Sequence, residues 1–238
     1  MPFQQRAVLT RELTQLREDI IRLGSMVDAA IDKSMIALAK RDIALAHEVV
    51  IEDEAINHLR FQVEEDALRI LATQQPMAID LRVVIAGIHF AVELERIGDH
   101  AAGNARLVER LENEEDIDTL YKLPKMAKRA RQMVQESVQA YVQQDADLAL
   151  ALVSYDDKID KQYRKLFRGA LKQMQDSQYI RRATFLLWIG HNLERIGDRA
   201  INMAERVIFM VTSEFVENLD DVDDYDDFMD GVSGDLQG

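Results

Sequence analysis

Hydrophobic residues recur every three or four positions along most of this chain, which is the spacing of one face of a helix. The pattern predicts six helices, at about residues 8–40, 42–72, 79–111, 125–143, 146–173 and 178–211. Asp42 and Asp145 stand at the starts of the second and fifth helices, where an aspartate side chain can cap the first turn. Alternating strand patterns are essentially absent, so the sequence predicts an all-α protein.

The six predicted helices form two copies of one unit. The segment LERIGD at residues 94–99 recurs at residues 193–198, and weaker matches upstream keep the same order in both copies. Short connections make successive long helices antiparallel neighbours. We therefore predict two tandem three-helix bundles related by internal pseudo-symmetry. The first unit covers residues 1–112, the second covers residues 113–212, and an acidic tail covers residues 213–238.

Charge and composition narrow the functional classes. The net charge is −14, but residues 213–238 hold ten acidic residues and no Lys or Arg, which leaves −4 for the rest. No basic stripe is concentrated enough to track nucleic-acid phosphates. We expect the tail to be solvated and disordered, with a docking arm for a basic partner surface as the alternative.

The absence of cysteine excludes disulfides and thiolate metal ligands. Because the sequence carries neither a signal peptide nor a transmembrane run, we predict a cytoplasmic protein.

Acidic residues occupy a helix face that is otherwise hydrophobic. Glu95 and Asp99 of the third predicted helix share the face that should point at neighbouring helices. They lie away from a polar stripe that is made of Arg82, His89, Glu93, Arg96 and His100. Asp53 of the second helix falls among hydrophobic residues in the same way.

Antiparallel packing brings these acidic groups together. If the chain reverses at Pro76, Asp53 lies level with Asp99, and Asn57 lies level with Glu95. In the second unit, the same reasoning pairs level residues as follows: Asp156 with Asp198, and Asp160 with Glu194.

Carboxylates at one level of a bundle repel one another unless a cation, a proton or an arginine compensates. The sequence leaves two alternatives open. One is a hard or borderline metal ion held by oxygen ligands, and the other is an ion-pair network that uses Arg96 and Arg195. His100 and His191 are possible further ligands. Asp28 and Asp32 are a possible further acidic pair, although their counterparts in the second unit are Gln135 and Gln139.

The repeated Glu-Arg-Ile-Gly-Asp motif, the segments at 53–57 and 156–160, and the segment from Gln75 to Arg82 together resemble the PhoU family over about residues 8–212. The resemblance implies two symmetry-related three-helix bundles that bind multinuclear iron or zinc clusters through E(D)xxxD motifs. In this chain those motifs are Glu95 with Asp99, Glu194 with Asp198, and Asp156 with Asp160. Asn57 replaces the last acid of the fourth motif, which begins at Asp53.

The resemblance also implies a negative regulator of phosphate uptake and phosphate-starvation signalling. Such proteins restrain the ATPase subunit of the phosphate ABC transporter and a PhoR-type sensor histidine kinase. We therefore predict a non-enzymatic, metal-binding adaptor that forms a homodimer and meets the membrane only through its partners. The alternatives are a di-metal carboxylate protein with oxidase or metal-storage activity and a bundle without metal. The di-metal class needs Glu-x-x-His motifs, and this sequence contains none.

Overall fold

The computed structural model describes residues 3–114, 122–153 and 156–215, without the side chains of residues 3–5 and 156–158. Its elements are α1 (Phe3–Lys40), α2 (Ile43–Gln74), α3 (Ile79–Arg110), α4 (Leu123–Gln143), α5 (Ala146–Val153), α6 (Asp156–Gln173), the 3₁₀ helix η2 (Ser177–Tyr179) and α7 (Ile180–Thr212). No strand occurs in these three stretches, which confirms the all-α prediction. The helix predicted over residues 146–173 is described as α5 and α6, on either side of residues 154–155. The predicted disorder of the tail concerns residues that, from 216 onward, lie outside the described ones.

Both units begin their second helix in the same way. Arg41 and Gln144 adopt the left-handed conformation, with φ of 54° and 53°, and so reverse the chain after the first helix of each unit. The following aspartate then caps the next helix. Oδ1 of Asp42 accepts a hydrogen bond from the Leu45 N–H at 2.9 Å, and Oδ1 of Asp145 accepts one from the Leu148 N–H at 2.9 Å. The predicted caps are confirmed, and the internal repeat extends to the backbone conformation of the loops.

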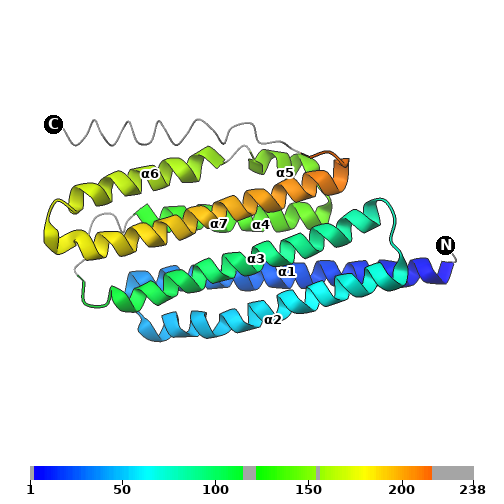
Figure 1. The fold of residues 1–238 in the computed structure, drawn as a ribbon, viewed down its shortest axis with the longest axis horizontal. Helices are drawn as coiled ribbons and strands as arrows, with labels where there is room; N and C mark the ends of the chain where they lie inside the picture. Colours follow the sequence, from blue (N-terminus) through cyan, green and yellow to red (C-terminus); the bar gives the residue numbers. More distant parts are fainter. Residues whose placement is uncertain (1–2, 115–121, 154–155, 216–238) are drawn as a thin grey trace.

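The helices form two layers. Figure 1 shows α2, α3, α7 and α6 side by side, with α1 and α4 behind them. Neighbours along the chain are antiparallel, and α3 and α7 pack against each other where the two units meet. None of the described helices carries an apolar stretch long enough to cross a membrane.

One hydrophobic core runs through both units. The rings of Phe90 on α3 and Tyr141 on α4 pack with their centroids 4.7 Å apart, and the Tyr141 hydroxyl donates a hydrogen bond to the Val83 carbonyl at 3.1 Å. Burial raises the pKa of Tyr141, so this hydroxyl stays a neutral donor. Helices α1 and α4 also approach closely, since a Cβ added at Gly24 would lie 3.0 Å from Val138 Cγ2. The two units are therefore fixed to each other by packing.

Candidate metal centres

The first acidic cluster forms where α2 packs against α3. Gly98 lets the two helices approach, because an added Cβ would lie 3.1 Å from Ile56 Cδ1 and 3.2 Å from Asp53 Oδ1. Asp53 therefore sits at the level of Gly98 and Asp99, as the register argument predicts. The second unit repeats this close approach of two helices. A Cβ added at Gly197 would lie 3.0 Å from Cδ1 of Ile159, which is the counterpart of Ile56.

Asp53 is the most constrained acid of this cluster. The residue is only 8% exposed, and its Oδ1 atom is buried without a hydrogen-bond partner among the described residues. Burial raises the pKa of Asp53, the nearby charge of Asp99 raises it further, and Arg106 acts in the opposite direction. An ionised carboxylate at this position is only partly compensated, because the effect of Arg106 is smaller than those of burial and Asp99.

Glu95 and Asp99 complete the acidic part of the cluster. Burial raises the pKa of Glu95, and Asp99 raises it further, while Arg60 and Arg96 lower it. Asp99 itself is exposed rather than buried against α2, and Asn57 is half-buried. The face that carries these residues therefore lies at the edge of the α2–α3 contact, open to solvent on one side.

In the first unit, Arg96 makes its ion pair with the polar stripe, although its charge, like that of Arg60, still lowers the pKa of Glu95. Nη1 of Arg96 donates to Glu93 Oε1 at 3.2 Å, on the polar stripe, and not to Glu95 or Asp99. The second unit differs. Nη1 of Arg195 donates to Asp198 Oδ2 at 3.0 Å, and His191 Nδ1 lies 2.8 Å from Glu194 Oε2.

Part of the second cluster lies outside the described residues. The backbone of Asp156 begins α6, but its side chain is not described. Asp160 is half-buried one turn further along, with a solvent-inaccessible Oδ1. The predicted meeting of Asp156 with Asp198 and of Asp160 with Glu194 stays a prediction.

The donor set of the first cluster fits a hard or borderline cation. It offers carboxylate and amide oxygens, one of which is buried and unpartnered, and two carboxyl groups whose pKa values are raised. In the part of the chain that the structure describes, no three Asp, Glu or His side chains are already gathered closely enough to hold a metal ion. Metal binding would therefore require Glu95 and Asp99 to turn toward Asp53.

The other predicted acidic pair has a structural role. Asp28 and Asp32 on α1 both accept hydrogen bonds from Arg131 on α4, with Arg131 Nε at 2.8 Å from Asp28 Oδ1. This pairing links the two units and satisfies the carboxylates.

The polar stripe of α3 forms a seam with α7, which the helical wheel did not reveal. Nη1 of Arg199 donates to Glu93 Oε2 at 3.1 Å, and Asn192 Nδ2 donates to Asn104 Oδ1 at 2.8 Å. Burial lowers the pKa of His100, and the neighbouring Arg199 lowers it further. His100 is therefore held neutral within the seam. A signal was present in the sequence, because α7 carries Asn192, Arg195 and Arg199 at the positions of the repeat that match Glu93, Arg96 and His100.

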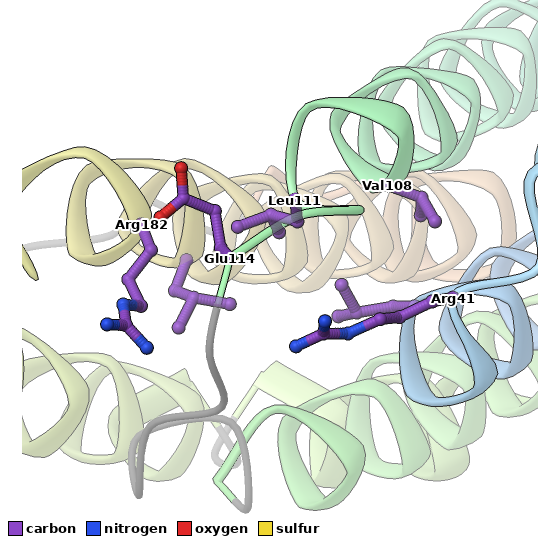
Figure 2. Close-up of a pocket in the computed structure, with 7 residues that line it drawn as sticks. Arg41, Val108, Leu111, Glu114 and Arg182 are labelled. Atoms are coloured by element: carbon purple, nitrogen blue, oxygen red, sulfur yellow. The ribbon is translucent and has the colours of Figure 1, made fainter.

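A small cavity lies where the ends of α1, α3 and α7 meet (Figure 2). Its volume is about 10 Å³, which is roughly the space of one water molecule. Figure 2 shows the guanidinium groups of Arg41 and Arg182 on either side of the space below Leu111. Arg182 is 3% exposed and its guanidinium carbon lies 4.3 Å from the centre of the Tyr179 ring. The cavity is too small to admit a substrate.

The chain matches known proteins over most of its length. The PhoU domain matches residues 20–108 and 123–207, one match in each unit. A Clostridium acetobutylicum protein named "Phosphate-specific transport system accessory protein PhoU homolog" is 32% identical over 214 residues, which are 89% of this chain and 98% of that protein. A Pseudomonas aeruginosa protein of the same name is 35% identical over 210 residues, 87% of each chain.

Solved structures agree with these matches. The crystal structure of PhoU from Pseudomonas aeruginosa superposes with a TM-score of 0.82 at 35% identity, over 86% of this chain and 99% of that one. The phosphate transport system regulatory protein PhoU from Streptococcus pneumoniae gives a TM-score of 0.83 at 31% identity, over 88% and 100%. The two matched domains, the relatives and the shared fold show that this chain belongs to the PhoU family.

Proposed function

We propose that this protein is a negative regulator of phosphate uptake and of phosphate-starvation signalling. The observation that carries the proposal is the match to PhoU relatives along nearly the whole chain, because those relatives are named accessory proteins of phosphate-specific transport. The protein acts in the cytoplasm as an adaptor without catalytic activity. Its partners are the ATPase subunit of the phosphate transporter and a PhoR-type sensor histidine kinase, which it engages as a homodimer.

Deletion of the gene tests the regulatory role. In phosphate-rich medium, the deletion strain should express phosphate-starvation genes that the parent strain keeps silent, because the restraint on the kinase is lost. A plasmid copy of the wild-type gene should restore repression of the phosphate-starvation genes. Unchanged expression in the deletion strain would overturn the assignment.

Metal binding is the second part of the proposal. Asp53, Glu95 and Asp99 of the first unit, with Asn57 nearby, would hold a divalent or ferric ion, namely zinc or iron. Asp156, Asp160, Glu194 and Asp198 would do the same in the second unit. A bound cation would neutralise the carboxylates and draw α2 to α3. Support comes from the buried, unpartnered Oδ1 of Asp53 and from the raised pKa values of Asp53 and Glu95.

Titration with zinc and ferric ions, followed by metal analysis, tests this part. Wild-type protein should retain metal after gel filtration. Asp53→Asn should retain less metal, because it removes the buried charge, whereas Glu54→Gln on the exposed side of α2 should match the wild type. Equal metal content in all three proteins would contradict a site at Asp53. Oxygen consumption by the iron-loaded protein would favour an oxidase instead.

A further inference from the structure

An exposed apolar surface lies where α3 begins and α7 ends. We call it the end patch and define it by four residues on or just before α3 that are 36–74% exposed, namely Met77, Ile79, Leu81 and Ile85. Arg82 Nε donates to the Met210 carbonyl at 2.8 Å, which places the first turn of α3 beside the last turn of α7. Leu81 and Ile85 are four residues apart and so lie on one face of α3, and solvent-exposed apolar side chains that are neighbours in this way mark an interaction surface.

The chain leaves α7 at this same place and in a defined direction. Ser213 ends the helix in the left-handed conformation, with φ of 70°, and its N–H bonds to the Phe209 carbonyl. The chain then turns back, so that the Phe215 ring stacks on the Phe209 ring with centroids 4.2 Å apart. Phe215 is 68% exposed and therefore continues the apolar surface.

The sequence that follows has a regular amphiphilic pattern. Starting at Val216, an apolar residue occurs at every third position, followed by two acidic or asparagine residues, in the order VEN-LDD-VDD-YDD and then Phe228. In a conformation with three residues per turn, such a pattern puts all apolar side chains on one edge and the carboxylates on the other sides. A segment of this kind fits a surface that is apolar in its centre and basic around it.

The charge around the end patch is of the required sign. Arg82, His89 and Arg206 lie at this end of the α3–α7 seam. Two acids of α3 lie along this stretch, and arginines other than Arg82 and Arg206 already pair with them: Asp80 accepts from Arg6, and Glu93 accepts from Arg96 and Arg199. The charge of Arg206 adds to burial in lowering the pKa of His89, which shows that the two groups lie close together. Carboxylates placed over these side chains would be attracted to them.

We propose that residues 216–224 fold back onto the end patch of their own chain, with Val216, Leu219 and Val222 against Leu81 and Ile85 and the intervening carboxylates near Arg82 and Arg206. The chain is long enough for Leu219 to reach the end patch, because the four residues from Phe215 to Leu219 span up to about 14 Å. Ile85 lies one turn beyond Arg82, which already contacts the end of α7. The acidic segment is thus a cover for this surface, and an acidic partner segment of the same pattern would compete with it.

Disulfide trapping tests the proposal. Because the sequence contains no native cysteine, only the introduced cysteines can form disulfides. One variant carries Ile85→Cys with Leu219→Cys. The matched control carries Leu150→Cys with Leu219→Cys, because Leu150 is on α5 at the same end of α7 but on its other side (Figure 1). Leu150 is 56% exposed and Ile85 is 38% exposed, so a freely moving segment would react with position 150 at least as fast.

Under a mild oxidant at low protein concentration, the Ile85 pair should close within one chain about tenfold faster than the Leu150 pair, equivalent to about 1.4 kcal/mol of preference. Equal rates, or a faster Leu150 pair, would overturn the proposal. A disulfide between two chains would also overturn it, by showing that the surface takes the segment of a second copy. Circular dichroism melts confirm that both variants are folded.

A charge series separates ionic attraction from apolar contact. Changing Asp220, Asp221, Asp223 and Asp224 to Asn should reduce the rate advantage of the Ile85 pair at least about threefold, because the attraction to the arginines is lost. The matched control changes Asp226, Asp227, Asp230 and Asp235 to Asn, which removes the same charge beyond the docked residues and should leave the advantage nearly unchanged. An equal effect of both sets would contradict the local pairing with Arg82 and Arg206.

Discussion

The substitution Asp53→Asn removes the charge of a buried carboxylate while keeping its shape. Oδ1 of Asp53 has no hydrogen-bond partner among the described residues, and the residue is 8% exposed. Leaving a buried polar group unpaired costs about 1–3 kcal/mol. We expect the low end, because the amide that replaces the carboxylate is itself polar. In the absence of metal, the free energy of unfolding should rise by about 1 kcal/mol, which for a chain of this size raises the melting temperature by about 2–4 °C.

The effect should depend on pH in a defined direction. Because the pKa of Asp53 is raised in the folded state, ionisation of this group destabilises the fold at every pH above that folded value. As pH falls through the folded pKa and toward the ordinary pKa of an aspartate, about 3.9, the carboxyl protonates in both states and the penalty disappears. The advantage of Asp53→Asn over the wild type should therefore be full near pH 7 and should vanish in acid.

Thermal melts followed by circular dichroism, in a chelator and with added zinc, check this reasoning. Glu54→Gln, on the exposed side of the same helix, is the control and should stay within about 0.5 kcal/mol of the wild type. Added metal should stabilise the wild type more than Asp53→Asn. If Asp53→Asn melts below the wild type in chelator at pH 7, the carboxylate has a favourable partner and the reasoning is wrong.

Three further predictions concern the fold, each measured by chemical denaturation. Gly98→Ala should lower the free energy of unfolding by about 1–3 kcal/mol, because the new Cβ would lie 3.1 Å from Ile56 Cδ1. Gly103→Ala on the same helix, with only Asn192 Nδ2 at 3.4 Å, should raise it by about 0.5–1 kcal/mol, and the reverse order would contradict the close approach of α2 and α3. Asp42→Ala and Asp145→Ala should each lower it by about 1 kcal/mol through loss of a cap, and a smaller effect than that of an exposed Asp147→Ala would contradict the capping role. Glu93→Gln should lower it by about 1.5–3 kcal/mol, because the acid accepts from two arginines, and the exposed Glu109→Gln should have little effect.

The register of the bundles could be predicted from the sequence because it depends on local signals. Pro76 marks the reversal between α2 and α3, and antiparallel helices then fix which residues lie level. The contact between Gly98 and Asp53 agrees with that register. The duplicated motif supported this register, because the same pairing of level residues had to hold in both units.

Side-chain pairing could not be predicted, because one arginine can reach several acids. Arg96 pairs with Glu93 in the first unit, whereas its repeat counterpart Arg195 pairs with Asp198. Only the three-dimensional environment decides between these choices. Glu194 and Asp198 belong to the predicted acidic cluster of the second unit. These acids have a histidine and an arginine beside them, so the clearest test of repulsion is now in the first unit, at Asp53.

A helical wheel shows that a stripe is polar but not whether it faces water or another helix. The stripe of Arg82, Glu93 and His100 was of this kind, and the structure places it against α7. Its residues pair with polar groups of the second unit, including Arg199 and Asn192.

The seam also explains why the two halves of the chain are not interchangeable. Helices α3 and α7 cross with Glu93 opposite Arg199 and His100 beside Asn192. In the repeat, Glu93 corresponds to Asn192 and His100 corresponds to Arg199. Two copies of the first unit joined through the same surface would place a glutamate opposite a histidine, and two copies of the second would place an asparagine opposite an arginine. Only the tandem arrangement matches a carboxylate with a guanidinium. This divergence of the two repeats therefore favours packing of the first unit against the second over packing of either unit against a copy of itself.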